Sequence, residues 1–399
     1  MTRLDATDPD LGASGAEVLA SRLIHCDVET FAEQYWGARP LLTRGADDYS
    51  DLLSPAIVDS LLSEHGLRTP FLRVAKNGAT LPDSSFTAPA GVGAGIGDQL
   101  DDTALWRQFA DGATLVLQAL HRTWQPIVDL SSRLGTELGH PVQANAYITP
   151  PQNQGFDAHY DVHDVFVLQT VGSKRWIIHE PVLTDPLRDE PWSDRKAQVA
   201  EAAAGEPLID TVLEPGDALY LPRGWLHSAK ALGEVSVHLT LGIHVWTGYA
   251  LAEQLTRSAL DLLRDDPDVR ATLELGVDHP LALDLIRQRL LDAIAVADPG
   301  VRFQQVRRSQ ARPAPLGPLA QLAALNGLTE QSRLRLRPAL TARIEGDRLT
   351  SRAGWLALGP TEKQAMQALM TAGESSAADL GTDFARRLLR AGIVLPADR

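Results

Sequence analysis

Short alternating strand patterns crowd into residues 142–245, and this segment constrains the fold of the chain more than any other. Its clearest run is 235–244, where apolar and polar side chains alternate with a period of two. Many short strands joined by turns are typical of a barrel or jelly roll, in which one face of a sheet can line a cavity. We therefore predict a mainly β core with added α-helices. Further strands are expected at residues 142–149, 164–171, 174–179, 208–213 and 218–222.

Two histidines and an aspartate within this segment have metal-ligand spacing. His159 and Asp161 form a His-x-Asp pair, and His227 follows 68 residues after His159. Two imidazoles and one carboxylate are the ligand set that holds non-haem Fe(II) on one face of an octahedron and leaves positions open. Residues i and i+2 of a strand share a face, so we expect His159 and Asp161 to point into one cavity. His227 is expected at the end of a strand–turn element. The alternative is that His159 and His227 are ordinary polar residues near the core.

Lys174 is a candidate ligand-binding residue. Its predicted strand places it on the same face as Trp176 and Ile178, so we expect it to point inward. An inward ammonium group needs an anionic partner, and the distal carboxylate of a bound dicarboxylate would be one. The alternative is an edge lysine that reaches water. Four further histidines are additional candidates for metal or acid–base roles, but we interpret each more simply as a hydrogen-bonding or surface residue: His163, His179, His238 and His244.

Length and composition favour a multidomain cytoplasmic protein. At 399 residues with 44% hydrophobic content, the chain is expected to form two or three domains. No apolar run approaches the roughly 20 residues of a membrane span, and the N-terminus lacks the apolar segment of a secretory signal. Cys26 is the only cysteine, which excludes an internal disulfide and favours the cytosol.

Charge is distributed unevenly along the chain. The overall net charge of −14 combines +7 in residues 301–352 and zero in 353–399, which leaves −21 for the first 300 residues. An acidic catalytic part would attract a basic partner and repel nucleic acid. The alternative is that the acidity only keeps the protein soluble.

The apolar period changes to 3.6 after Val245. Helices are expected at about 248–265 and 280–296, with amphipathic leucine patterns that need a partner surface. A linker rich in Pro and Gly follows at Arg312, and the last segment contains helix and strand patterns. In that segment we expect 332–337 and 340–349 to form a small hairpin. The predicted domains are therefore 1–247, 248–311 and 312–399.

Several motifs together resemble the ribosomal oxygenases, which are 2-oxoglutarate hydroxylases of the JmjC type with a cupin fold. The resemblance covers about residues 25–395 and is most specific from 145 to 240. It rests on Asn145-Ala-Tyr-Ile-Thr-Pro, Gln154-Gly-Phe, His159-Tyr-Asp, His163-Asp-Val-Phe-Val-Leu-Gln, Gly172-Ser-Lys-Arg-Trp, Gly216-Asp-Ala-Leu-Tyr-Leu-Pro-Arg-Gly-Trp-Leu-His and, near the N-terminus, Phe31-Ala-Glu-Gln-Tyr-Trp-Gly-Ala-Arg-Pro-Leu-Leu.

The resemblance implies a fold, a site and an activity. The fold is a double-stranded β-helix (jelly roll) of the cupin and JmjC type, followed by a helical dimerisation segment and a winged-helix domain. The implied iron ligands are His159, Asp161 and His227. The co-substrate 2-oxoglutarate, which reacts with O2, would be held by Lys174 with Asn145 and Tyr147, and Thr240 or His238 would complete its pocket. The implied reaction is hydroxylation of a histidine or arginine side chain of a ribosomal protein by a homodimer.

Other functions remain open from the sequence alone. A JmjC-type enzyme could demethylate lysine, or hydroxylate another protein or a small molecule. A cupin could also bind a ligand or partner without catalysis. A third class is a DNA-binding regulator, for which the three arginines of the last predicted helix offer weak support: Arg386, Arg387 and Arg390. We expect no membrane association and no requirement for nucleic acid.

Overall fold

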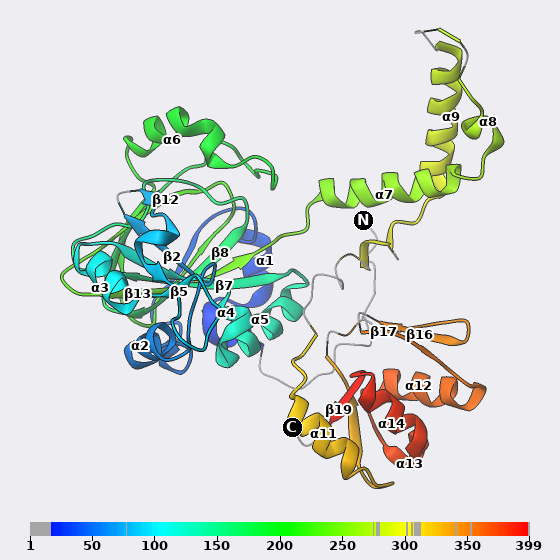
Figure 1. The fold of residues 1–399 in the computed structure, drawn as a ribbon. Helices are drawn as coiled ribbons and strands as arrows, with labels where there is room; N and C mark the ends of the chain where they lie inside the picture. The colour runs from blue at the N-terminus through cyan, green and yellow to red at the C-terminus, as the bar shows by residue number, and fades with distance from the viewer. Residues whose placement is uncertain are drawn as a thin grey trace. The chain divides into compact units, whose positions relative to one another are not determined.

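The computed structural model describes residues 17–76, 78–273, 275–276, 280–300, 302–304, 306, 313–338, 340, 342–351 and 353–397. The chain forms two compact units, one comprising Gly15–Val245 and the other containing Trp246–Arg399 (Figure 1). Each unit is described by itself below. The predicted domain boundary between residues 311 and 312 lies outside the described residues.

The first unit is built on two antiparallel sheets. The larger has the strand order β1-β11-β8-β13-β7-β6-β2-β3, and the smaller has the order β10-β9-β12. The bounds in the larger sheet are β1 Leu41–Thr43, β11 Ala218–Leu221, β8 Asp164–Val171, β13 Ser236–Ile243, β7 Val142–Thr149, β6 Thr114–Leu117, β2 Leu72–Lys76 and β3 Ala79–Thr80. Those in the smaller sheet are β10 Ile209–Leu213, β9 Lys174–His179 and β12 Leu226–Ala231. A short pair, β4 Thr87–Ala88 and β5 Gln99–Leu100, is separate.

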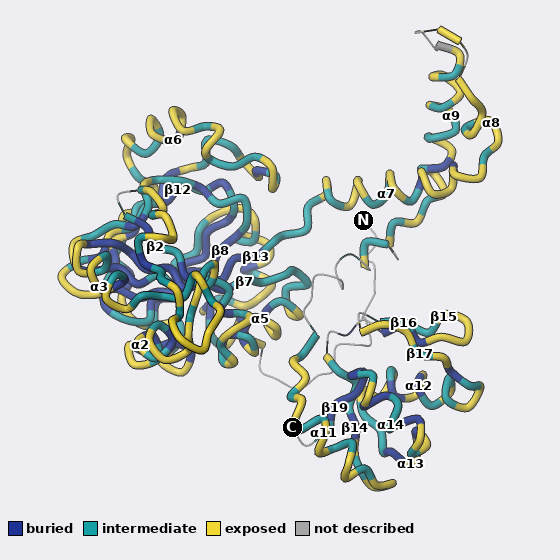
Figure 2. Tube along the Cα trace, in the orientation of Figure 1, coloured by how far each residue is buried: buried dark blue, intermediate teal, exposed yellow. Residues whose placement is uncertain are grey.

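Strand β13 shows why this sequence forms a two-sided sheet. Its odd-numbered apolar residues are buried in the main core, whereas His238 and Thr240 on the opposite face line a cavity. The alternation predicted for this strand is therefore confirmed. Figure 2 shows the central strands of the sheet as largely buried.

The two sheets are joined by a tight turn at Gly172 between β8 and β9. Gly172 has a φ of +60°, and a Cβ atom there would lie 2.2 Å from the carbonyl oxygen of Val235. Only glycine fits this conformation and this close approach. The turn matters for the site because β9 begins two residues later, at Lys174.

The first unit also contains helices. They are the π-helical turn η1 Leu19–Leu23, α1 Val28–Gln34, α2 Pro55–Ser63, α3 Asp102–Ala110, α4 Leu120–Thr123, α5 Gln125–Leu138 and α6 Lys196–Ala203. Short 3-10 turns occur at η2 Tyr49–Asp51, η3 Asp83–Ser85 and η4 Trp192–Arg195. Ser54 caps α2, and its side chain accepts a hydrogen bond from the backbone N–H of Ile57.

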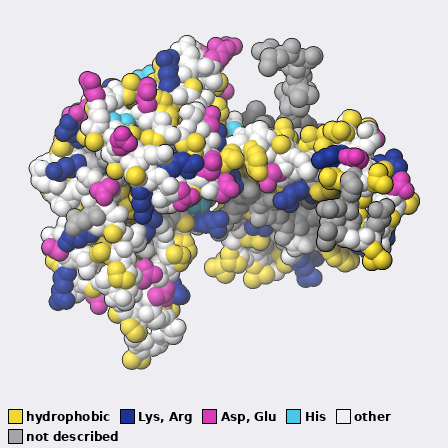
Figure 3. All heavy atoms as spheres, turned by 90° about the horizontal axis from the view of Figure 1, so that it is seen from above, with side chains coloured by type: hydrophobic (Ala, Val, Ile, Leu, Met, Phe, Trp, Pro, Cys, Tyr) yellow, Lys and Arg dark blue, Asp and Glu magenta, His cyan; other side chains and the backbone are white. Residues whose placement is uncertain are grey.

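The second unit begins with helices α7 Gly248–Leu263, α8 Pro267–Arg270 and α9 Pro280–Val296. Helices α7 and α9 pack together around Ala259, Leu263 and Ala293. Many other apolar side chains of these helices are exposed. Figure 2 colours much of α7 and α9 as exposed or intermediate, and Figure 3 shows hydrophobic side chains at the molecular surface. The exposed set on α7 and α9 is Tyr249, Leu251, Leu260, Leu262, Leu281, Leu283, Leu285, Leu291 and Val296.

The C-terminal part combines helices α11 Pro318–Asn326, α12 Pro360–Ala372, α13 Ala377–Leu380 and α14 Thr382–Arg390 with two three-stranded sheets. The predicted hairpin between 332–337 and 340–349 is wrong. Strand β14, Arg333–Leu336, pairs instead with β18 Glu374–Ser376 and β19 Val394–Pro396, while β15 Arg343–Glu345 pairs with β16 Arg348–Ser351, which also pairs with β17 Gly354–Ala357. Among the described helices of both units, none combines the length and hydropathy of a transmembrane span.

Candidate functional site

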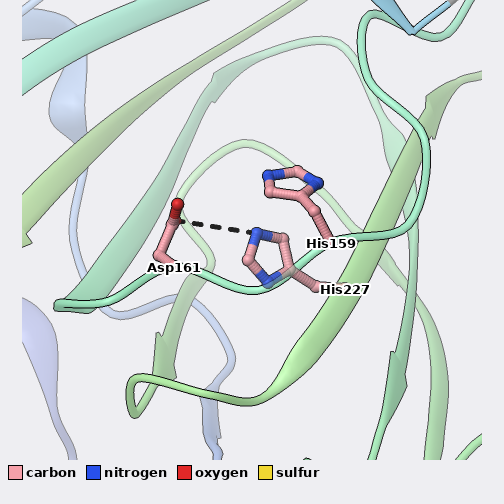
Figure 4. A group of neighbouring side chains, drawn as sticks. All are labelled: His159, Asp161 and His227. Carbon is pink, nitrogen blue, oxygen red and sulfur yellow. Dashed lines mark ion pairs between the residues drawn. The ribbon is translucent and has the colours of Figure 1, made fainter. Parts of the chain in front are cut away.

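His159, Asp161 and His227 meet in one cavity of the first unit. Each offers a ligand atom, and these atoms all lie within 4.8 Å of one another. Figure 4 shows the two imidazoles and the carboxylate gathered at one point. Nε2 of His227 lies 3.8 Å from Oδ2 of Asp161, and the two imidazole centroids are 4.5 Å apart. The three donors form a group that could bind one divalent cation.

The local structure around these residues differs from the prediction. His159 and Asp161 do not lie on a regular strand. His159 forms an isolated bridge with His227, in which each backbone N–H donates to the other carbonyl, and Asp161 lies in the loop before β8. His227 is the second residue of β12 rather than the end of a strand–turn element. The backbone pairing of His159 with His227 therefore places two of the candidate ligands side by side.

Backbone carbonyls orient both imidazoles. Nδ1 of His159 lies 2.7 Å from the carbonyl oxygen of Asp157, and Nδ1 of His227 lies 3.0 Å from that of Trp225. We assign the proton of each ring to Nδ1, since a carbonyl can only accept a hydrogen bond. The lone pair of Nε2 is then free for a metal ion, as in many metal-bound histidines.

Charge at the site also suits a cation. Burial, aided by the neighbouring His159, lowers the pKa of His227 to about 4, so its imidazole is neutral at physiological pH. Burial raises the pKa of Asp161, but the nearby His163, His227, His159 and Arg73 together more than offset this, and the carboxyl pKa falls below its ordinary value. A neutral imidazole and an ionised carboxylate are the protonation states that metal binding requires.

Lys174 points into the same cavity, as predicted. It is 4% exposed, and its Nζ donates a hydrogen bond to Oγ1 of Thr149 at 3.1 Å. Burial lowers its pKa to about 7. Two other buried polar atoms of the cavity wall have no hydrogen-bond partner among the described residues, namely Nδ1 of His238 and Nε1 of Trp176. These groups fit a ligand that brings negative charge and acceptor oxygens.

Tyr147 and Thr240 line the cavity beside Lys174. The Tyr147 ring stacks on His238, with centroids 4.9 Å apart and an interplanar angle of 2°. Burial, together with the nearby Asp161, raises the Tyr147 pKa to about 12, so its hydroxyl keeps its proton. The pKa of His238 lies well below its ordinary value because of burial and the neighbouring Lys174, so its imidazole is neutral.

Asn145 is placed differently from the other candidates. It lies on β7, directly opposite Thr240 of β13, but it is not among the residues that line the cavity. Its Oδ1 accepts a hydrogen bond from the backbone N–H of Ala119 at 3.0 Å. Ala119 has a left-handed φ of 58° and precedes α4, so Asn145 stabilises this junction. Its role in co-substrate binding stays a prediction.

The remaining candidate histidines lie at different places. His163 and His244 stack on each other with centroids 5.2 Å apart, and the Nε2 atoms of His163 and Gln143 are 3.0 Å apart. His179 is buried at the end of β9. Of these four histidines, His238 is the one that lines the cavity.

The cavity contains residues that sequence reasoning missed. Its volume is about 230 Å³, and its wall also includes Arg73, Phe156 and Trp192. Arg73 comes from β2 and Trp192 from η4, both distant in sequence from the motifs. The available signal for Arg73 was a lone charge in the apolar run Phe71-Leu-Arg-Val-Ala. Val165 and Val167 contribute apolar surface to the cavity wall.

Comparisons with known proteins identify the class of the site. Residues 120–251 match the family model described as "JmjC domain", so this part of the first unit is a JmjC domain. Solved structures of the Escherichia coli ribosomal oxygenase YcfD have the same fold, with a TM-score of 0.54 at 19% identity over 94% of this chain and 99% of that chain. The predicted double-stranded β-helix core is thus confirmed.

Sequence relatives define the family more closely. "Ribosomal oxygenase 1" from Gallus gallus is 30% identical over 281 residues, 67% of this chain and 44% of the relative. The protein of the same name from Bos taurus is 35% identical over 224 residues, 53% of this chain and 30% of the relative. The chain thus spans less than half the length of these curated relatives. Residues 120–251 thus form a JmjC domain, and the chain is similar to the ribosomal oxygenases over 67% of its length, which confirms the resemblance seen in the motifs.

Proposed function

We propose that this chain is an Fe(II)- and 2-oxoglutarate-dependent oxygenase that hydroxylates a histidine or arginine side chain of a ribosomal protein. The observation that carries the proposal is the meeting of three metal-ligating side chains and a buried lysine in one cavity. Similarity supports it, since one solved structure of the Escherichia coli protein is described as a complex with cobalt and 2-oxoglutarate and another as a complex with cobalt and succinic acid.

The residues present fit the metal. His159 and His227 each direct Nε2 toward the carboxylate of Asp161 with Nδ1 bonded to a backbone carbonyl. Two imidazoles and a carboxylate suit Fe(II) and leave coordination positions for a co-substrate and O2.

The residues present also fit a dicarboxylate. Lys174 is nearly inaccessible to water, and its ammonium group bonds to a neutral hydroxyl, that of Thr149, rather than to a carboxylate. An anionic carboxylate beside Nζ would restore the charged form of the lysine. The hydroxyls of Thr149, Tyr147 and Thr240 and the free Nδ1 of His238 offer further contacts in and beside the cavity wall.

With iron and co-substrate bound, the site would supply the chemistry that converts a substrate C–H into C–OH with one atom of O2, while the other atom enters succinate as 2-oxoglutarate loses CO2. The contribution of the chain is to fix the three donors, hold the distal carboxylate through Lys174, and line the site with Val165, Val167 and Trp176.

A basic protein substrate fits the charge of the catalytic part. The first 300 residues carry a net charge of −21, which favours association with basic proteins. A surface hollow on the segment that also contributes Trp192 to the catalytic cavity is lined by three acidic and two basic side chains, so it carries a small negative charge: Asp189, Glu190, Asp194, Arg195 and Lys196. These features support a ribosomal protein as the partner, with no need for nucleic acid. We place the reaction in the cytoplasm, which the single cysteine favours.

We also propose that α7 and α9 form a homodimer interface, and that residues 312–399 form a winged-helix domain. The exposed leucines of these two helices form a larger apolar surface than a monomer usually presents to water. A two-fold contact between identical helical segments would bury them.

Lysine demethylation is the main competing function. Relatives from Drosophila carry the name "Bifunctional lysine-specific demethylase and histidyl-hydroxylase NO66", and one from Drosophila grimshawi is 30% identical over 67% of this chain. Hydroxylation of a small molecule and ligand binding by a non-catalytic cupin are two further functions that the experiment must separate from the proposed one.

Succinate release from 2-oxoglutarate tests the proposal. The purified chain with Fe(II), 2-oxoglutarate and ribosomal proteins should form succinate and add 16 Da to one ribosomal protein. Formaldehyde release from a methylated lysine would favour demethylation. No succinate under any of these conditions would favour a non-catalytic cupin.

A further inference from the structure

Arg73 is a cation in the catalytic cavity without a carboxylate partner. Its guanidinium lies over the Phe156 ring, 5.1 Å from the centroid, and its charge partly offsets the rise in the pKa of the neighbouring Tyr147 hydroxyl. No acidic side chain among the described residues forms an ion pair with it. Its Nε is buried and has no hydrogen-bond partner within the described chain. Buried donors of this kind are normally satisfied, so this arginine has bonding capacity for a ligand.

Strand pairing places Arg73 at one end of the cavity wall. Arg73 of β2 lies opposite Val116 of β6, Val116 opposite Tyr147 of β7, and Tyr147 opposite His238 of β13. Neighbouring strands are about 4.8 Å apart, so the backbones of Arg73 and His238 are separated by roughly 14 Å across this row. At the other end of the row, the nearby charge of Lys174 helps to lower the pKa of His238. The row therefore has one cationic residue near each end.

The two ends suit different ligands. Lys174, with Thr149, is the end that suits the distal carboxylate of the co-substrate. The Arg73 end is connected to the metal site through Phe156, whose ring centroid lies 6.0 Å from that of His159. Trp192 also lies beside His159, with its ring centroid 6.2 Å away. The Arg73 end thus offers aromatic walls and hydrogen-bond donors beside the metal ligands, which is the place for a target side chain.

The net charge of the loaded site then favours some target side chains over others. The charges of a divalent metal, Asp161, a dicarboxylate and Lys174 cancel, so Arg73 leaves the loaded site with a net positive charge. Arginine stays protonated under all ordinary conditions. A second unpaired cation brought close to it is repelled, more strongly in a partly buried site than in water. A neutral group that accepts a hydrogen bond from Arg73 or Tyr147 is attracted instead.

We propose that Arg73 is a specificity-determining residue that selects a neutral, hydrogen-bond-accepting ring, the imidazole of histidine, and rejects arginine, lysine and methylated lysine. This inference rests on the proposed hydroxylase function and narrows its substrate class. The flat aromatic walls of Phe156 and Tyr147 favour an imidazole over the smaller amide of asparagine. The reaction would convert one C–H of the histidine side chain into C–OH, with the second oxygen atom of O2 in succinate.

Peptide binding tests the selection directly. Four pools of 15-residue peptides would differ only in a fixed central residue, His, Arg, Lys or Asn, with Gly and Ser around the centre and Lys at both ends. Binding to the full-length protein would be measured without O2, with Co(II) and 2-oxoglutarate present. We expect the His pool to bind at least about tenfold more tightly than the Arg and Lys pools, a factor that corresponds to a modest electrostatic difference. The affinity of the His pool should fall below pH ~6.5, where the peptide imidazole becomes protonated.

Variants of Arg73 distinguish an effect of its charge on peptide binding from an effect on the structure of the cavity. Arg73→Glu should reverse the ranking so that the Arg pool binds at least as tightly as the His pool, and Arg73→Lys should keep the wild-type ranking. Arg73→Gln, which keeps a hydrogen-bonding group but removes the charge, should remove the discrimination if the Glu variant does not fold. Arg175→Glu is a matched control, because Arg175 is exposed on β9 and pairs with Asp210; it should leave the ranking unchanged.

Equal binding or no binding of all four pools, or an unchanged ranking in both Arg73→Glu and Arg73→Gln, would overturn the inference. Hydroxylation of the Arg pool in preference to the His pool, detected by a gain of 16 Da, would do the same. Succinate release by the wild-type protein in the presence of ribosomal proteins tests the proposed hydroxylase function separately, since its absence would defeat that function whatever the binding ranking shows.

Discussion

Replacing Lys174 by methionine should stabilise the ligand-free protein and weaken co-substrate binding. Lys174 is 4% exposed, and burial lowers its pKa from 10.5 to about 7. Between these values the unfolded chain binds more protons than the folded chain, so stability rises with pH in this window. The cost of burying the amine is therefore fully present below pH 7 and disappears near pH 10.5. A shift of this size corresponds to about 3–6 kcal/mol at pH 7.

Methionine fills a similar volume without a charge. Lys174→Met should therefore raise the free energy of unfolding at pH 7 by up to about 3–6 kcal/mol. The same change removes the cation that would face the distal carboxylate. Truncating one partner of a buried charge pair costs about 2–4 kcal/mol in binding, which raises the Kd for 2-oxoglutarate about 30- to 1000-fold. Lys174→Arg keeps the charge and should lose less affinity.

Thermal unfolding with and without 2-oxoglutarate measures both effects, because a ligand stabilises the folded state according to its concentration relative to Kd. The methionine variant should unfold at a higher temperature than the wild type without ligand, but gain less from added ligand. Lys230→Met, on the exposed side of the neighbouring strand β12, is a matched control that should change neither quantity. A variant that is less stable without ligand and binds 2-oxoglutarate as well as the wild type would refute the reasoning.

Three further predictions concern the metal, the hydroxyl beside Lys174, and assembly. His159→Ala and Asp161→Ala should each abolish tight Co(II) binding, measured by calorimetry, and succinate formation, with little change in melting temperature; undiminished metal binding would disprove the ligand assignment. Thr149→Val should raise the KM for 2-oxoglutarate about 5- to 10-fold, since Lys174 loses its hydrogen bond; an unchanged KM would show that this bond does not help hold the amine in place. Leu285→Glu, at an exposed site on α9, should give a monomer by light scattering, and a wild-type chain that is itself monomeric at micromolar concentration would exclude the dimer.

Local patterns made most of the catalytic core predictable. The period of two in β13 reflects the geometry of a single strand, and it placed His238 and Thr240 on the face that lines the cavity. The same reasoning placed Lys174 inward, because it shares its strand face with Trp176. These predictions succeeded because each depends on neighbours within a few residues.

Features that depend on distant pairing were not predictable in this way. The backbone of His159 is fixed by its bridge to His227, not by a strand of its own, and no local pattern indicates such a contact. Asn145 caps the junction at Ala119, a partner that only the folded chain brings near. Arg73 enters the cavity because β2 joins the sheet beside β6. Its position in an apolar strand was visible in the sequence, but its destination depended on the order of the strands.

The catalytic cavity concentrates polar groups that the ligand-free chain does not satisfy. Lys174 is buried without a counter-charge, and Arg73, Trp176 and His238 each have a buried nitrogen with no partner among the described residues. Such groups destabilise the folded state by about 1–3 kcal/mol each. The apolar core beneath the sheet offsets this cost, and a ligand that brings negative charge and acceptor atoms removes part of it. Because strand pairing already fixes these groups, ordering them on ligand binding costs little free energy. The same unsatisfied groups that lower stability therefore make the cavity selective for an anionic co-substrate at one end and a neutral acceptor at the other.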